Sequence, residues 1–228
     1  MPAMLKETIV EVFDRSREAG WVLEPDAKAL FRSAGLAVPA FVRADSAEEA
    51  AAAGAKIGYP VVAKVVSPRV VHKSDVGGVA VGVKDEKALR EVFDRFASME
   101  GFSGMLVEQM VSGVEVIIGA KIDYQFGPVV LLGIGGTGVE IYEDVAIRMA
   151  PLSAGDVSSM IGELTGRKLL EGFRGAPPVS LTALTTTLVV FSEVVMVAAD
   201  RIESIDLNPV MCTADACIIA DARIMLSS

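Results

Sequence analysis

The sequence has little histidine, cysteine or tryptophan: its 228 residues include one histidine, two cysteines and one tryptophan. A zinc site built on Cys212 and Cys217 would need two further ligands, which a chain with one histidine can hardly supply. We therefore interpret both cysteines as reduced thiols.

Clustered positive charge is also lacking. The formal net charge is -9, from 21 Lys and Arg against 30 Asp and Glu, and no basic run is longer than a pair. A nucleic-acid-binding surface must neutralise phosphates with clustered Lys and Arg. The composition therefore excludes DNA and RNA as expected partners.

Uninterrupted apolar segments of membrane-spanning length are absent, although 52% of the residues are hydrophobic. The longest candidate, residues 181–199, contains Ser192, Glu193 and three consecutive threonines, so we interpret it as a core helix and expect no membrane span. Residues 1–16 mix charges throughout and have no apolar region typical of a secretory signal. We expect a cytoplasmic protein.

Helical and strand patterns alternate along the chain, which indicates an α/β or α+β protein. Helices are predicted to begin at Pro25, Ser46, Asp85, Ser153 and Ser180. Strands are predicted at 61–66, 105–107, 114–120 and 128–132, followed by a hairpin of 203–210 with 217–225.

A glycine-rich run, Gly133-Ile134-Gly135-Gly136-Thr137-Gly138, matches the G-x-G-x-x-G pattern of dinucleotide-binding turns. That motif needs a following helix. Apolar residues here instead recur with a period of two, at Val139, Ile141, Val145, Ile147 and Met149. We therefore expect the glycines to join two strands, and keep the dinucleotide turn as the disfavoured alternative.

The only histidine, His72, opens the run His72-Lys73-Ser74-Asp75-Val76-Gly77-Gly78. Imidazole is a nucleophile toward phosphorus at neutral pH, and a lysine with paired glycines suits a nearby anion. The alternative is a solvated loop histidine without chemistry.

Three candidate residues for contacts with an anion or a nucleotide lie in or beside apolar strands. Lys64, inside Val61–Val66, must either reach solvent at the strand end or meet an anion such as phosphate. Glu108 and Glu115 flank a short connection, where one could engage an adenine amino group and the other ribose hydroxyls.

The last hairpin carries a candidate metal site. Asp206 and Asn208 point to the same face of their strand, and a turn centred near Thr213 and Ala214 would bring Asp221 opposite Asp206. Oxygen ligands gathered without a nearby Lys or Arg favour Mg²⁺ with phosphates, whereas the alternative is a solvated hairpin face.

Together these segments resemble the beta subunit of ADP-forming acetyl-CoA synthetase, an ATP-grasp protein related to the succinyl-CoA synthetase beta subunit. The resemblance covers nearly the whole chain. It is carried by residues 58–64, 72–79, 125–129, 148–152, 172–178 and 206–210. Relatives carry bulkier apolar residues at the positions of Thr137-Gly138.

The resemblance implies an α+β ATP-grasp fold, with two α/β lobes and the nucleotide between them. Its N-terminal lobe would be residues 23–111 and its C-terminal lobe residues 112–228, with residues 1–22 packed on the latter. The implied reaction is acyl-CoA + ADP + phosphate giving acid, CoA and ATP. A CoA-binding alpha subunit is the implied partner, in a heterotetramer with two copies of each.

The same resemblance implies residue roles. His72 would relay the phosphoryl group, with Asp206 an acidic residue near it. Lys64 would contact the phosphates of ATP or ADP, Glu108 the adenine, Glu115 the ribose and Lys28 the nucleotide again, while Asn208 and Asp221 match Mg²⁺ ligands.

Two other functions remain open. An ATP-grasp carboxylate ligase would activate its acid as an acyl phosphate and would not need His72. A non-catalytic nucleotide-sensing module would bind ADP or ATP and exchange no phosphate.

Overall fold

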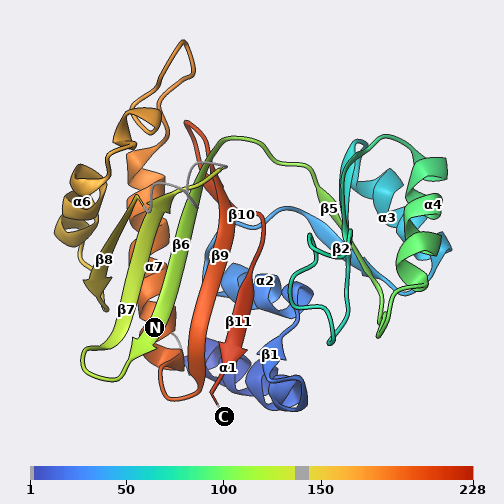
Figure 1. The fold of residues 1–228 in the computed structure, drawn as a ribbon, viewed down its shortest axis with the longest axis horizontal. Coiled ribbons are helices and arrows are strands. Elements are labelled where there is room, and N and C mark those ends of the chain that lie inside the picture. The colour runs from blue at the N-terminus through green and yellow to red at the C-terminus, as the bar shows by residue number, and fades with distance from the viewer. Residues whose placement is uncertain (1–2, 137–143, 228) are drawn as a thin grey trace. The chain divides into compact units, whose positions relative to one another are not determined.

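A computed structural model describes residues 3–136 and 144–227 of the chain (Figure 1). The chain divides into two compact units, a small one of residues 39–111 and a large one of residues 1–38 with 112–228. The segment 23–38 therefore belongs to the large unit, which differs from the lobe boundary predicted at residue 23. The physical reason is that Ala27, Leu30 and Phe31 are buried in the core of the large unit.

The small unit is a four-stranded antiparallel sheet with two helices. Its strands follow the order β2-β5-β3-β4. Their bounds are β2 (Phe41–Ala44), β3 (Val61–Val65), β4 (Val79–Val83) and β5 (Met105–Gln109), and the helices are α3 (Ala47–Ile57) and α4 (Glu86–Ala97). Both helices begin where the sequence predicted, because the side chains of Ser46 and Asp85 accept hydrogen bonds from the backbone N–H groups of Glu49 and Ala88.

The large unit is built on a seven-stranded sheet of order β1-β11-β9-β6-β7-β8, with β10 also paired to β9. Its strands are β1 (Trp21–Val22), β6 (Val114–Asp123), β7 (Gly127–Ile134), β8 (Val145–Met149), β9 (Ile202–Cys212), β10 (Cys217–Ile219) and β11 (Arg223–Leu226). Its helices are α1 (Ala3–Ser16), α2 (Glu24–Ser33), α6 (Ala154–Glu163) and α7 (Leu181–Ala198), with short 3₁₀ helices η1 (Arg17–Ala19) and η2 (Arg167–Leu169).

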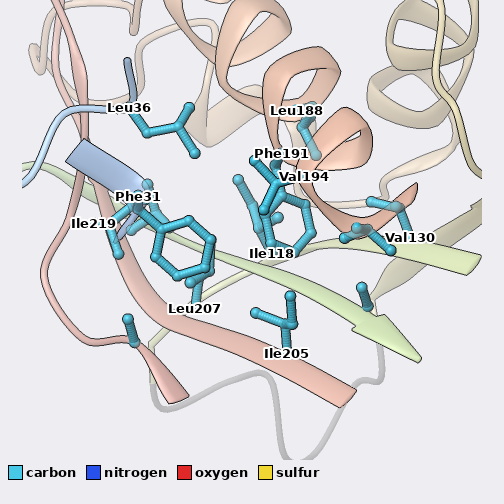
Figure 2. Packing of buried hydrophobic residues seen from close by; sticks show 14 of the residues in the cluster. Phe31, Leu36, Ile118, Val130, Leu188, Phe191, Val194, Ile205, Leu207 and Ile219 are labelled. Atoms are coloured by element: carbon cyan, nitrogen blue, oxygen red, sulfur yellow. The ribbon is translucent and has the colours of Figure 1, made fainter. Parts of the chain in front are cut away.

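Helix α7 crosses one face of this sheet, behind β6 and β7 in Figure 1. By length and composition it is apolar enough to cross a membrane, with 44% of its residues buried inside the protein. Figure 2 shows Leu188, Phe191 and Val194 of α7 turned toward Ile118 of β6. The Phe191 ring also approaches Phe31 of α2, with centroids 6.2 Å apart. The apolar stripe of this helix therefore forms the centre of the core.

The glycine-rich run follows an antiparallel strand, as expected. Strand β7 ends at Ile134, and β8, which starts at Val145, pairs with it antiparallel. A dinucleotide turn would instead lead from a parallel strand into a helix. Thr137, Gly138, Val139 and Ile141 lie outside the described residues.

Candidate functional site

In the small unit, Lys64 forms a buried ion pair with Glu108. Lys64 Nζ lies 2.9 Å from Glu108 Oε1, and the two side chains are only 7% and 3% exposed. The register explains the contact: Val62 pairs with Glu108 and Lys64 with Leu106, so the two charged residues are diagonal neighbours on one face of β3 and β5. The solvent-exposed alternative for Lys64 is wrong, and the anion it meets here is a carboxylate.

His72 lies on the exposed side of a compact turn that links β3 to β4. The turn is closed by hydrogen bonds from Gly78 N–H to the Lys73 carbonyl (2.7 Å) and from Val65 N–H to the Gly78 carbonyl (2.8 Å). A Cβ at residue 78 would lie 2.5 Å from Val65 Cγ1, so only glycine fits there. The imidazole is thus accessible and is carried by a backbone fixed to the strand that holds Lys64.

In the large unit, Glu115 lines a pocket of about 420 Å³. The pocket walls are Gly113, Val114, Ile134, Gly135, Gly136 and Leu169. The Gly135 N–H donates to the Glu115 carbonyl at 2.7 Å, and a Cβ at residue 135 would lie 2.7 Å from Glu115 Cβ. The glycines therefore allow the end of β7 to approach β6 closely, which leaves room for a ligand beside one carboxylate.

The last hairpin pairs differently from the expectation. Arg223, not Asp221, lies opposite Asp206, and Arg223 Nη2 donates to Asp206 Oδ2 at 3.1 Å. The turn is centred one residue later than predicted, because the Thr213 hydroxyl accepts the N–H groups of Asp215 and Ala216 and so fixes a turn over 213–216. When the centre of a hairpin turn moves by one residue, the residue that lies opposite a given position changes by two. Asp206 consequently has a cationic neighbour that the sequence argument excluded.

Asp221 lies in the gap between β10 and β11, where the register of the flanking pairs would set it across from Asn208. The register is the same on both sides of the gap between β10 and β11, since Ile219 pairs with Val210 and Arg223 with Asp206. Within the gap, the N–H groups of Ala220 and Asp221 both donate to the Pro209 carbonyl, at 3.0 and 3.3 Å. The two expected ligands, Asn208 in β9 and Asp221 in this gap, thus lie on neighbouring segments of the chain.

Asn208-Pro209 coincides with a bulge in β9. Val116 of β6 pairs with Val210 and Ile118 with Leu207, so two residues of β9 oppose Ile117 alone. A bulge tolerates proline because it needs no ladder hydrogen bond from that residue. The dipeptide that the sequence singled out therefore marks an interruption of the sheet.

The oxygen donors at this interruption fit Mg²⁺. Asn208 is exposed and Asp221 half-buried, and their amide and carboxylate oxygens are the hard ligands that this ion takes. Within residues 3–136 and 144–227, no three His, Cys, Asp or Glu side chains form a set able to hold a metal alone. Mg²⁺ bound here would need phosphate or water oxygens as well, as in sites that act on nucleotides.

Lys28 is an internal residue of the large unit. Its side chain is completely buried, with Nζ 2.9 Å from Glu24 Oε1 and 2.7 Å from the Ala220 carbonyl oxygen, to which it donates. No part of the ammonium reaches solvent in this structure, and the direct contact with the nucleotide stays a prediction. The residue that the ammonium meets, Ala220, directly precedes the candidate ligand Asp221.

Cys212 and Cys217 face each other across β9 and β10 as free, buried thiols. The hydrogen bond between them, together with burial, raises the pKa of the Cys212 thiol. A raised pKa keeps the thiol protonated and unreactive, which agrees with their interpretation as reduced residues.

Sequence reasoning missed two residues of this region, Glu24 and Arg223. The first carried a usable signal, since Glu24 precedes Lys28 by four residues and so shares its helix face. Arg223 carried no such signal in the sequence, because its contact with Asp206 depends on the register of the hairpin.

The chain matches known proteins over nearly its whole length. The ATP-grasp domain family matches residues 14–226. The beta subunit of acetate–CoA ligase [ADP-forming] I from Pyrococcus furiosus is 38% identical, over 90% of this chain and 91% of that protein. Acetate–CoA ligase [ADP-forming] II from Archaeoglobus fulgidus is 39% identical over 90% of this chain, which spans 30% of that longer protein.

A solved structure of acetyl-coenzyme A synthetase 1 from Ca. Korarchaeum cryptofilum is similar in fold. It superimposes with a TM-score of 0.84 at 39% identity, covering 96% of this chain and 100% of that chain. That structure holds coenzyme A and Mg-AMPPCP, with its phosphohistidine segment pointing towards the nucleotide binding site. Since both the domain match and the full-length relative cover most of the chain, this protein belongs to the ATP-grasp family, among the beta subunits of ADP-forming acetyl-CoA synthetases.

Proposed function

We propose that this chain is the nucleotide-binding beta subunit of an ADP-forming acyl-CoA synthetase. Its step would be phosphoryl transfer between a phosphohistidine and ADP or ATP, within the reaction acyl-CoA + ADP + phosphate giving acid, CoA and ATP. The observation that carries the proposal is the exposed His72, the only histidine, on a fixed turn that follows the strand of the buried Lys64.

In this proposal each unit contributes its own nucleotide contacts. Lys64, oriented by Glu108, contacts phosphate oxygens from the small unit. From the large unit, Glu115 accepts from ribose hydroxyls in its pocket, and Asn208 and Asp221 hold Mg²⁺. The bound Mg²⁺ neutralises phosphate charge, which phosphoryl transfer requires.

His72 is the residue that accepts and donates the phosphoryl group in this proposal. A ring nitrogen of His72 forms a bond to the γ-phosphorus of ATP while the bond from phosphorus to the bridging oxygen breaks, and ADP leaves. The reverse step makes ATP from ADP. In this proposal Asp206 lies near the phosphoryl group, and its carboxylate is paired with the Arg223 guanidinium at 3.1 Å.

The proposed partner is a CoA-binding alpha subunit that carries the phosphohistidine segment, in a heterotetramer with two copies of each, in the cytoplasm. The name of the Pyrococcus relative, a beta subunit, implies a partner subunit for that protein. The longer Archaeoglobus relative supports the same arrangement, since this chain matches only 30% of it.

The isolated chain is expected to bind ATP or ADP with Mg²⁺ but to form no acyl-CoA. The reason is that its candidate residues serve the nucleotide alone. Titration calorimetry with ATP and Mg²⁺ tests the binding, and a thiol assay for acyl-CoA formation from acetate, CoA and ATP tests the activity. Full synthetase activity from the purified chain would contradict the proposal.

Asp221→Ala is expected to lower the Mg²⁺-dependent gain in ATP affinity by about tenfold or more, because one of two protein ligands is lost. Affinity for ATP in EDTA should stay unchanged. Calorimetry with and without Mg²⁺ measures both quantities. Asp215→Ala, an exposed aspartate in the turn of the same hairpin, is the matched control and should leave both unchanged. An unaltered Mg²⁺ dependence in Asp221→Ala would reject the ligand assignment.

A further inference from the structure

Lys28 and Glu24 form a completely internal ion pair in helix α2 of the large unit. Their side chains are 0% and 4% exposed, and Nζ lies 2.9 Å from Glu24 Oε1. Burying an ammonium and a carboxylate costs free energy of desolvation, and mutual attraction often offsets this only in part. Apolar residues of the same size would often serve stability equally well. Stability is therefore a poor explanation for a lysine at this position.

The lysine makes one contact that an apolar side chain could not make. Its ammonium donates to the Ala220 carbonyl at 2.7 Å, across 192 positions of sequence. Ala220 lies in the gap between β10 and β11, where strand pairing to β9 is interrupted. The contact therefore joins a core helix to the one break in this hairpin strand among the described residues.

The backbone at this break departs from regular strand geometry on both sides of the hairpin. Ile219 and Ala222 are both buried, so the two residues between them leave the regular alternation of inward and outward side chains. Across the gap, Asn208 and Pro209 likewise separate the buried Leu207 from the buried Val210. The N–H groups of Ala220 and Asp221 donate to the Pro209 carbonyl, and the Ala220 carbonyl accepts from Lys28. These contacts together fix the backbone from which the Asp221 side chain projects.

We propose that Lys28, held by Glu24, is a positioning residue that fixes the Ala220–Asp221 backbone and so orients the Asp221 carboxylate toward Mg²⁺ beside Asn208. This inference rests on the proposed function, because it takes Asp221 as a metal ligand. Lys28 acts through the Ala220 carbonyl and touches neither nucleotide nor metal. Loss of a residue that orients a metal ligand without touching the metal typically lowers metal affinity by about 10- to 100-fold.

The test is the double variant Glu24→Gln with Lys28→Met, which removes both charges and keeps side-chain size. The full chain is titrated with ATP in Mg²⁺ and in EDTA by calorimetry. The Mg²⁺-dependent gain in affinity should fall by about tenfold, and affinity in EDTA should be unchanged. Amide hydrogen exchange at Ala220 and Asp221 should become faster, since their hydrogen bonds to Pro209 depend on the same backbone.

Leu30→Ala is the matched control, because Leu30 is a buried residue of the same helix that is 1% exposed. It should lower the thermal stability by leaving a cavity, yet keep the full Mg²⁺ dependence. A merely structural role for Lys28 predicts that the two variants behave alike. If the double variant does not fold, Lys28→Gln replaces it: its amide can still bond Glu24 but is one atom shorter toward Ala220, so Mg²⁺ dependence should fall.

Asp221→Ala is measured in parallel to separate the two claims. If Asp221→Ala loses the Mg²⁺ dependence and the Lys28 variants keep it, the positioning role is wrong and the proposed function stands. If Asp221→Ala keeps the Mg²⁺ dependence, the metal assignment itself fails. Loss in both, with Leu30→Ala unaffected, is the result that we expect.

Discussion

His72→Ala is expected to abolish phosphoryl transfer between ATP and the partner subunit while sparing nucleotide affinity. Removal of a nucleophile that acts after the nucleotide has bound lowers the transfer step, by more than about 10⁴-fold, and leaves binding unchanged. The measurement uses γ-labelled ATP with Mg²⁺, with and without a candidate alpha subunit. Label on the wild-type chain should be labile in acid and stable in base, as a phosphoramidate is.

Val76→Ala is the control for this experiment, since Val76 is a 52% exposed residue of the same turn without a nucleophilic group. It should transfer label at the wild-type rate. Transfer by His72→Ala at that same rate would make His72 an ordinary loop residue and favour the carboxylate ligase. Nucleotide binding without any exchange, in the wild type and with a partner present, would favour the nucleotide-sensing module.

Lys64→Met is expected to weaken nucleotide binding and destabilise the protein together. It leaves the Glu108 carboxylate, 3% exposed, without its ammonium, and removing one member of a buried pair costs about 3–5 kcal/mol. Loss of a charged hydrogen bond to phosphate would lower ATP affinity by about tenfold or more. Thermal unfolding and calorimetry measure the two effects separately.

The double variant Lys64→Met with Glu108→Gln separates stability from binding. Replacing the Glu108 carboxylate with a neutral amide should restore most of the lost stability, because no unpaired buried charge remains. ATP affinity should stay low, since the phosphate contact is still missing. Recovery of affinity together with stability would show that Lys64 is a structural residue of the small sheet only.

Local signals in the sequence predicted most helix boundaries. Ser46, Asp85 and Ser153 each accept a hydrogen bond from the backbone N–H three residues later, and these contacts need no distant partner. Helix α1, by contrast, was not predicted, and its apolar residues gain stability by burial in the core of the large unit.

Long-range pairing decided the details of the candidate site. Residue types alone suggested that Lys64 needs an anion, but the register of β3 with β5 determined that Glu108 meets it. Likewise, the turn around Thr213 determined that Asp206 faces Arg223, and it left Asp221 in the gap between β10 and β11. A shift of one residue in a turn changes every pair after it, which composition and spacing do not reveal.

The amino-acid sequence was enough to predict the family, the alternating helices and strands, and a candidate set of residues for phosphoryl transfer, because motifs and local hydrogen bonds depend on neighbouring residues. Only the tertiary structure decided what each of these side chains touches. Lys28 is the clearest case: its spacing in a helix was readable, but its burial and its contact with Ala220 arise from packing between segments 192 residues apart. Such contacts form because the hydrophobic core brings α2 under the last hairpin, and no local pattern encodes that distance.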